Sequence, residues 1–463
     1  MKTNLFWGLA SVIMLFPSCF QQETVEEVMK ANKTSLTFSV ARGISFSSTI
    51  VSEDDAVYVA SCFMKRNLQA TRSIFPQVES LIHDNQTIGY VVNYPEGGFC
   101  IVASSKNAYP ILAYSNKGKF SVSDIGNSGV SVWLDAYTLS WKNLSDEEKK
   151  LNQMHWDEYE RPLVYPTVMS DQEKAAIFNQ RLMELNEEFG GKGDARPLIA
   201  FRGSSFMSES LYEMFKSKGG SEEFTIVVCE REDRGVKIPA MISTEWHQYK
   251  PFGKYTKYGI AGCTVIAASQ IMNYYKFPTY YDWNAMPIND YNNPTLCQFI
   301  LDVCNKFDVE YKPTGTSSDI NKVKKGLEEF GYRVEKKEGS HPALIREIRR
   351  PIYERGESKE GEGHAWIVDG YNEVDVMYYF TVEYLRGSSG SYYYQRDATR
   401  YVGGDSNPAV VATKHYNWGW ADDGPALNGW YYSPELFPDD LKQLIITPSN
   451  CLLYTSPSPR DKR

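Results

Sequence analysis

A single cysteine, placed between a glycine-rich loop and a run of small residues, constrains this chain more than any other feature. Residues 259–262 end in glycine, Cys263 follows directly, and residues 264–272 are small or apolar and compatible with a helix. The pattern predicts that Cys263 lies on the first turn of a core helix, where unpaired N–H groups and the helix dipole favour thiolate over thiol. A thiolate is the form that a cysteine nucleophile needs. A buried structural cysteine fits the same local pattern, so the chemistry depends on partners elsewhere in the chain.

The candidate base for such a nucleophile is His364. A glycine precedes it and an apolar run, residues 365–368, follows it, which predicts a histidine at the mouth of a buried strand that ends in a turn at residues 369–370. About one hundred residues separate His364 from Cys263, which is ordinary for a pair that meets in space. For a lone histidine, a hydrogen-bonded structural role is the stronger interpretation.

Two further motifs supply the groups that a Cys–His pair requires. Asn417 offers a side-chain amide that can orient an imidazole, and Trp418 offers an indole that can shield that bond from water. Gln248 has a side-chain N–H that would form a two-donor oxyanion hole with the backbone N–H of Cys263. Each motif alone also fits a structural role, an aromatic cluster for the first and an ordinary polar residue for the second.

The composition argues against several classes of function. The chain has 463 residues, 42% of them hydrophobic, which is enough for two or three folded domains. Its net charge is −9 and it has no stripe rich in Lys and Arg, so nucleic acid is not an expected partner. The eight cysteines form no CxxC pair, and His415, His364 and Cys263 lack ligand-like spacing. Neither a metal nor another cofactor is therefore expected.

The N-terminus has the pattern of an export signal. Lys2 precedes an apolar run over residues 6–16 that is too short to span a bilayer, and a Pro-Ser-Cys sequence ends at Cys19. We interpret residues 1–19 as a signal peptide with a lipoprotein-like Cys19 that would carry lipid; a plain signal cleaved nearby is the alternative. Residues 20–50 form a polar tether. The predicted location is secreted or lipid-anchored at the bacterial cell envelope, with the membrane a partner only through that lipid.

The next region, residues 51–140, is predicted to be a small α+β domain. A capping-box pattern at residues 52–55 opens a helix, and strand-like runs follow at residues 89–94, 99–103 and 111–114.

Residues 141–237 are expected to be a helical connector with exposed loops. The charged stretch at residues 230–235 is the candidate site of activation cleavage, and a plain surface turn is the alternative. Residues 238–450 form a second domain that becomes rich in strands. Residues 451–463 are excluded from the fold as an unassigned, candidate non-native tail.

In their order and spacing these motifs resemble the streptopain family of bacterial secreted cysteine peptidases, which have a papain-like fold. In the first domain, residues 90–94, 97–99 and 109–115 look like that family's inhibitory propeptide. The resemblance implies an α+β chain in which a two-lobed, papain-like cysteine peptidase domain follows a small α+β inhibitory prodomain. The matching stretches of the second domain are residues 246–248, 262–272, 281–284, 363–370 and 417–420.

The resemblance also implies roles for individual residues. Cys263 would be the nucleophile, His364 the base and Gln248 the oxyanion donor. Asn417 and Trp418 would orient and shield the histidine, and which of them is the third catalytic member stays open. The resemblance further matches two substrate positions, a backbone contact at Gly363 and a pocket-loop residue at Ser317.

The implied function is that of a secreted cysteine endopeptidase made as a zymogen. It would hydrolyse peptide bonds through an acyl-enzyme, with proteins or peptides as substrates and its own propeptide as an intramolecular inhibitor. A catalytically weak homologue that acts as a surface-binding module is one alternative, and another Cys–His acyl-transfer enzyme, such as an amidase or transglutaminase, is a second. The chain departs from the family in an insertion at residues 373–414, a long connector and the loop at residues 252–255, which bear on substrate preference and activation.

Overall fold

The N-terminal domain of the computed structural model is a helix packed on a four-stranded antiparallel meander. Helix α2 (Glu53–Leu68) begins where Ser52 and Asp55 exchange hydrogen bonds, each backbone N–H donating to the other side chain at 3.2 Å. The predicted helix and strands are confirmed here. The meander comprises β1 (Gln77–His83), β2 (Gln86–Asn93), β3 (Phe99–Ala103) and β4 (Ile111–Ser115), and helices α3 (Val130–Lys142) and α4 (Asp146–Trp156) follow it.

The structure describes residues 48–449 with several gaps. The predicted signal peptide, Cys19, most of the tether and the tail lie outside the described residues. Within the described part, no helix is long and apolar enough to cross a membrane. The gaps are residues 69–75, 160–171, 190–192, 205, 249–251, 290–291, 314, 340, 342, 389–390, 404–410, 420–426 and 433–440.

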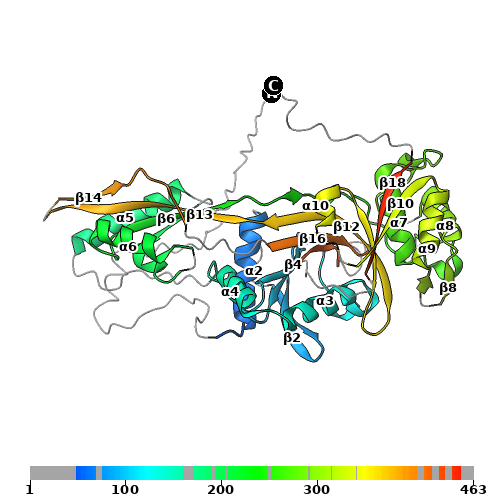
Figure 1. Ribbon diagram of the computed structural model, residues 1–463, viewed down its shortest axis with the longest axis horizontal. Helices are drawn as coiled ribbons and strands as arrows, with labels where there is room; N and C mark the ends of the chain where they lie inside the picture. The colour runs from blue at the N-terminus through cyan, green and yellow to red at the C-terminus, as the bar shows by residue number, and fades with distance from the viewer. Residues whose placement is uncertain are drawn as a thin grey trace, which may run out of the picture. The chain divides into compact units, whose positions relative to one another are not determined.

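The C-terminal domain has a helical lobe and a sheet lobe. Helices α7 (Cys263–Tyr275), α8 (Pro294–Lys306) and α9 (Ile320–Glu329) share one apolar core. Ile266 of α7 and Ile367 of strand β12 both belong to that core, so the helix that begins at Cys263 lies against β12 (Figure 1). The remaining elements are β8 (Glu310–Lys312), β9 (Gly315–Ser317), β10 (Tyr332–Glu338), α10 (Leu344–Ile348), β11 (Ile352–Glu357), β12 (Gly363–Val374), β16 (Val411–Asn417), β17 (Gly429–Tyr432) and β18 (Lys442–Pro448).

One sheet runs through both domains. Among the described residues it has eleven strands in the order β1-β2-β3-β4-β17-β16-β12-β11-β18-β10, with β7 (Lys237–Ile238) paired to β12. The domains join where β17 pairs with β4, at Tyr431 opposite Ala113 and Trp430 opposite Tyr114. The pairing places the N-terminal domain directly beside the strands that carry the candidate site residues.

A second sheet combines the connector with the predicted insertion. Strands β5 (Gly193–Pro197) and β6 (Ile226–Asp233) come from the connector, and β13 (Val376–Ser388), β14 (Ser391–Arg396) and β15 (Tyr401–Val402) come from the insertion. Helices α5 (Gln172–Glu188) and α6 (Glu209–Gly219) lie beside them (Figure 1). We call residues 172–233 together with residues 376–402 the accessory module.

Two local predictions are wrong. The charged stretch at residues 230–235 is not a loop, because Glu230–Asp233 belongs to β6 and pairs with β13. No turn follows Asp369, because β12 continues to Val374 and accommodates the position with a register shift between Val368 and Gly370. The Asp369 carboxylate accepts the N–H groups of Met241 (3.0 Å) and Ile242 (2.7 Å), which explains a polar residue inside an apolar strand.

Candidate active site

Cys263 is half-buried and is the first residue of α7, as the sequence predicts. The preceding Gly262 has φ of 86°, and a Cβ atom at that position would lie 1.7 Å from Thr316 Oγ1. Only glycine satisfies both the left-handed conformation and the close approach of strand β9. Gly262 therefore fixes the point at which the chain enters the helix and presents the Cys263 thiol.

The surroundings of Cys263 favour its thiolate. Burial opposes ionisation, but contact with the His364 ring and a hydrogen bond from the Ala365 N–H outweigh it, so the pKa of the Cys263 thiol is lowered. The free N–H groups of the first helical turn act in the same direction. The structure thus brings the predicted nucleophile and the predicted base together.

His364 is the second residue of β12 and is half-buried, at the mouth of the strand as predicted. Strand β11 holds it in register, with Gly356 opposite His364. Its Nε2 atom is buried and has no hydrogen-bond partner among the described residues. One ring nitrogen is therefore available for an orienting group while the ring contacts Cys263.

Gln248 is tied to the loop that leads into Cys263. Its carbonyl oxygen accepts the N–H groups of Ala261 (2.9 Å) and Gly262 (3.2 Å), and the residue is 8% exposed. Its side-chain Nε2 is buried without a hydrogen-bond partner among the described residues. A buried unpaired donor costs free energy, which a substrate oxyanion would relieve.

Asn417 ends strand β16 and pairs with a residue that the sequence analysis missed. Its amide exchanges two hydrogen bonds of 3.3 Å with the amide of Gln270 on α7, and its Oδ1 also accepts the Gly419 N–H at 3.0 Å. Gln270 is 1% exposed and receives the Thr244 hydroxyl at 2.8 Å. A polar residue in the otherwise small and apolar run 264–272 is the signal that identifies Gln270.

Trp418 is buried beside Asn417. Its ring stacks on Tyr416 at 4.7 Å between centroids and lies 5.2 Å from Trp366, which is two residues beyond His364. The indole therefore covers the strand that carries the histidine, where a shield is expected.

The two predicted substrate positions are both exposed. Gly363 is the first residue of β12, and Ser317 ends β9 next to Thr316, which touches Gly262. They therefore lie on β12, the strand that carries His364, and on β9, which adjoins the glycine before Cys263. Across the described residues, no group of three or more His, Cys, Asp or Glu side chains is arranged to hold a metal ion.

Comparison with known families connects this geometry to an activity. Residues 246–431, which contain all of the candidate catalytic residues, match the Peptidase C10 family. Residues 48–140 match the Spi protease inhibitor family. The chain therefore carries a region similar to Peptidase C10 behind a region similar to the Spi protease inhibitor. It is a cysteine peptidase made as a zymogen, with an inhibitory propeptide domain in front of the catalytic domain.

Known relatives of the chain include streptopain. The chain is 22% identical to streptopain of Streptococcus pyogenes over 353 residues, which cover 70% of this chain and 76% of the relative, and the same values hold for streptopain of serotype M1. Among solved structures, a fragment of prointerpain A from Prevotella intermedia aligns with 80% of this chain and 98% of its own, at 15% identity and a TM-score of 0.43.

The propeptide packs directly on Trp418. A Cβ atom on Gly129, at the start of α3, would lie 2.5 Å from the Trp418 ring, so the backbone of the propeptide touches the indole. Trp133 of α3 donates its indole N–H to the Tyr432 carbonyl at 2.9 Å. The propeptide therefore rests on the residues next to Asn417.

A polar cluster anchors the propeptide to the loop before His364. Asp135 of α3, with a side chain 3% exposed, accepts the Lys359 N–H at 2.8 Å and His83 Nε2 at 2.8 Å. The Lys359 ammonium lies 2.9 Å from Asp84 Oδ2, which Lys142 also contacts at 3.1 Å. Lys359 lies between β11 and His364 in sequence, so these charges restrain the segment that leads to His364.

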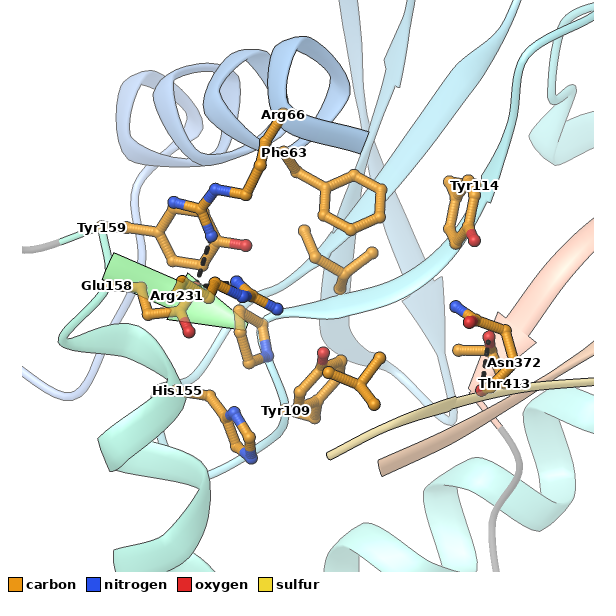
Figure 2. Close-up of a pocket in the computed structure, with 13 residues that line it drawn as sticks. Phe63, Arg66, Tyr109, Tyr114, His155, Glu158, Tyr159, Arg231, Asn372 and Thr413 are labelled. Atoms are coloured by element: carbon orange, nitrogen blue, oxygen red, sulfur yellow. Dashed lines mark hydrogen bonds and ion pairs between the residues drawn. The ribbon is translucent and has the colours of Figure 1, made fainter. Parts of the chain in front are cut away.

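A second cluster lies around Glu158, after α4. Its carboxylate accepts Arg231 Nη1 at 2.7 Å and also contacts Arg66 and the Tyr378 hydroxyl. Figure 2 shows Arg66 of α2, Arg231 of β6 and Glu158 turned toward one another in a pocket that Asn372 and Thr413 also line. This pocket joins the propeptide side of the chain to the accessory module and does not include Cys263.

Proposed function

We propose that Cys263 attacks the scissile carbonyl as a thiolate and that His364 is its general base and acid. The observation that carries the proposal is a thiol at the start of α7 whose pKa is lowered by the His364 ring and the Ala365 N–H, although burial opposes ionisation. The sulfur would bond to the carbonyl carbon, and His364 would give its proton to the leaving amine. Water that His364 deprotonates would then hydrolyse the acyl-enzyme.

The remaining site residues have supporting roles in this proposal. The oxyanion would lie between the Gln248 Nε2–H and the backbone N–H of Cys263, a role that the unpaired buried Nε2 supports. Asn417 would orient His364, and Trp418 would shield that contact. Both acceptor positions of Asn417 Oδ1 are now engaged by Gly419 and Gln270, so accepting the His364 N–H requires one of these bonds to be exchanged.

The proposal extends to substrate contacts and location. Gly363 and Ser317, both exposed beside the dyad, would contact the substrate backbone and side chain. The N-terminal pattern supports secretion, with a lipid on Cys19 as the form anchored at the cell envelope. We keep residues 51–140 as the inhibitory domain and residues 238–450 as the peptidase domain, with the activation cut between them.

Conversion of the purified full-length precursor is expected to release activity. A tethered inhibitor acts at high effective concentration, so the uncut chain should hydrolyse a fluorogenic peptide slowly and the rate should rise as the propeptide is lost. The measurement follows hydrolysis and fragment masses in parallel, with Cys263→Ala as the chain that stays uncut. A precursor that is as active before conversion as after it would contradict the proposal.

Asp135→Asn is expected to weaken the hold of the propeptide. The buried carboxylate then loses its charge opposite His83 and Lys359, and the half-time of conversion should shorten roughly tenfold. Asp146→Asn is the matched control, because that carboxylate is exposed on α4 and contacts Lys149 within the same helix. Equal half-times for Asp135→Asn and the control would exclude this cluster as a restraint.

The same cluster gives a sign for the effect of pH. Burial alone would raise the pKa of Asp135, but hydrogen bonds and charge from His83 and Lys359 outweigh it, so the pKa of Asp135 is lowered. Hydrogen bonds from Lys359 and Lys142 lower the pKa of Asp84 from 3.8 to about 2. Carboxylates with lowered pKa values stabilise the closed precursor above their ordinary pKa and stop doing so as the pH falls through the lowered one. Urea titration of the Cys263→Ala chain should therefore show that the propeptide contact weakens between about pH 4 and pH 2. The loss over this pH range should be smaller when Asp135→Asn is added to the same chain.

A further inference from the structure

The accessory module is assembled from two segments that flank Cys263 and His364 in sequence. Residues 172–233 precede Cys263, and residues 376–402 follow His364. Strand β6 of the first segment pairs with β13 of the second at eight consecutive positions, from Ile226 opposite Glu383 to Asp233 opposite Val376. Strand β5 then adds to the other edge of β6. Both segments are needed to complete this sheet.

The apolar core of the module also draws on both segments. Phe201 from the first segment packs edge-on against Phe380 from the second at 5.7 Å, and Phe215 packs against Tyr401 at 5.0 Å. All four side chains belong to or pack against one cluster. If residues 172–233 left, the insertion would expose these side chains and the unpaired edge of β13.

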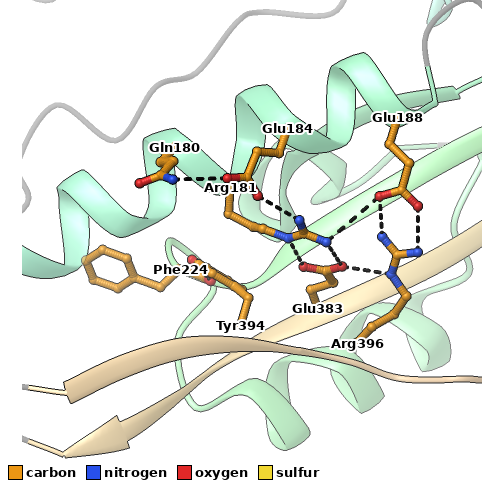
Figure 3. Close-up of polar contacts among 8 residues, drawn as sticks. All are labelled: Gln180, Arg181, Glu184, Glu188, Phe224, Glu383, Tyr394 and Arg396. Atoms are coloured by element: carbon orange, nitrogen blue, oxygen red, sulfur yellow. Dashed lines mark hydrogen bonds and ion pairs between the residues drawn. The ribbon is translucent and has the colours of Figure 1, made fainter.

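A buried carboxylate connects the two segments. Glu383 of β13, with a side chain 1% exposed, accepts Arg181 Nε and Nη2 of α5 and Arg396 Nε of β14, each at 2.8 Å. Arg396 also makes two bonds of 2.8 Å to Glu188 of α5. Figure 3 shows Arg181 and Arg396 on either side of Glu383, with Glu188 closing the group. Separating the segments would remove both Arg181 bonds from this carboxylate and leave it Arg396 alone.

The chain that follows β6 is bonded to the peptidase without a break. The Arg234 N–H donates to the Asp375 carbonyl at 2.7 Å, and the Val236 carbonyl accepts the Glu373 N–H at 2.9 Å. A Cβ atom on Gly235 would lie 1.6 Å from the Glu373 oxygen, which shows how closely the two backbones run. Strand β7 continues this pairing onto β12. A protease needs extended backbone that is free to enter its cleft, whereas the backbone from residue 226 to residue 238 is paired with neighbouring strands.

The propeptide is connected in a different way. Its helix α2 and strands β1–β4 form a contiguous stretch of chain, and it pairs with the peptidase strands at only two described positions, between β4 and β17. Its described polar link to the module consists of side chains around Glu158. Although the propeptide shares an apolar core with Trp366, Trp418 and Tyr431 of the peptidase, only two of its strand positions are paired there, so it can separate with its own sheet intact. Removing residues 172–233 would instead break eight strand pairs.

We propose that residues 172–233 remain with the peptidase after the propeptide has gone, so that the edge of β13 is a permanent docking surface for this segment. The mature enzyme then consists of a papain-like domain and a module built from the segment before it and from the insertion within it. A cut inside the segment would leave it bound as a second chain. The proposal depends on the zymogen organisation but not on the roles assigned to individual catalytic residues.

The test uses the Cys263→Ala full chain with a site for a sequence-specific protease inserted directly before Gln172. The chain is cut, the propeptide is removed by size exclusion in increasing urea, and hydrogen exchange is followed by mass spectrometry. At urea concentrations that release the propeptide, the amides of β6 and β13 should keep their protection from exchange to within about twofold of that in the uncut chain. Loss of β6 protection by about tenfold or more at or below those concentrations would overturn the proposal.

A pair of variants in the same chain tests the connection between the segments. Glu383→Gln should speed exchange of both β6 and β13 by at least about tenfold and leave β2 and β3 of the propeptide unchanged. Glu184→Gln is the control, because Glu184 contacts the same Arg181 at 2.8 Å but has a side chain 46% exposed, and its effect should stay within about twofold. If Glu383→Gln changes β13 but not β6, the segments do not form one unit. These variants lack the nucleophile, so failure of a peptidase assay leaves the result intact.

Discussion

Cys263→Ala and His364→Ala are each expected to reduce kcat/KM for a peptide substrate by roughly 10⁴-fold or more. In the proposed mechanism the thiolate supplies the electrons for the new bond, and His364, whose ring lowers the pKa of the thiol, moves the proton to the leaving amine. Because the two groups act as a unit, the double variant should be no worse than either single one. The measurement is the initial rate of hydrolysis after each variant has been matured by a trace of wild-type enzyme that is then removed.

Matched controls separate chemistry from folding in that experiment. Cys304→Ala removes a buried thiol from α8, and His341→Ala removes an exposed imidazole, and both variants should retain activity to within about threefold. Circular dichroism and urea midpoints should show folded protein for all four variants. A His364→Ala enzyme that turns over at the wild-type rate would mean that another group is the base.

Gln248→Ala is expected to lower kcat by roughly 10²–10³-fold with a smaller change in KM. The side-chain N–H is buried and unpaired, so its hydrogen bond is gained when charge develops on the substrate oxygen. The backbone bonds from Ala261 and Gly262 to the Gln248 carbonyl do not depend on the side chain, so the loop before Cys263 should keep its shape. Steady-state kinetics on matured protein measures both constants.

The control for that variant is Gln298→Ala on α8, whose amide is exposed and bonds Asp302 at 2.9 Å. Its kcat should remain within about twofold of wild type. A Gln248→Ala enzyme with unchanged kcat would assign the oxyanion to a different donor.

Local patterns in the sequence predicted the elements that carry the candidate dyad. A glycine before Cys263 and small residues after it specify a helix start, because the left-handed Gly262 and the contact with Thr316 both depend on the glycine. His364 follows glycine and leads an apolar run, which specifies a strand entrance. The cap of α2 follows from the same kind of short-range chemistry.

Features that depend on distant partners escaped prediction. Residues 230–233 are charged, which suits a loop, but pairing with β13 makes them a strand, and no short window contains β13. Asp369 reads as a turn residue until the N–H groups of Met241 and Ile242 are seen to meet its carboxylate. The Gln270–Asn417 pair likewise joins a helix to a strand far along the chain.

The most direct test of the central claim is covalent labelling of Cys263 by a peptidyl epoxide followed by mass spectrometry of intact protein and fragments. Such a reagent needs a reactive thiolate and an open cleft together. The account predicts one adduct, on Cys263, which forms rapidly in matured enzyme, slowly in uncut precursor and hardly at all in His364→Ala. Absence of an adduct on Cys263 in matured protein, or equal labelling of precursor and matured forms, would contradict a latent cysteine peptidase with this nucleophile.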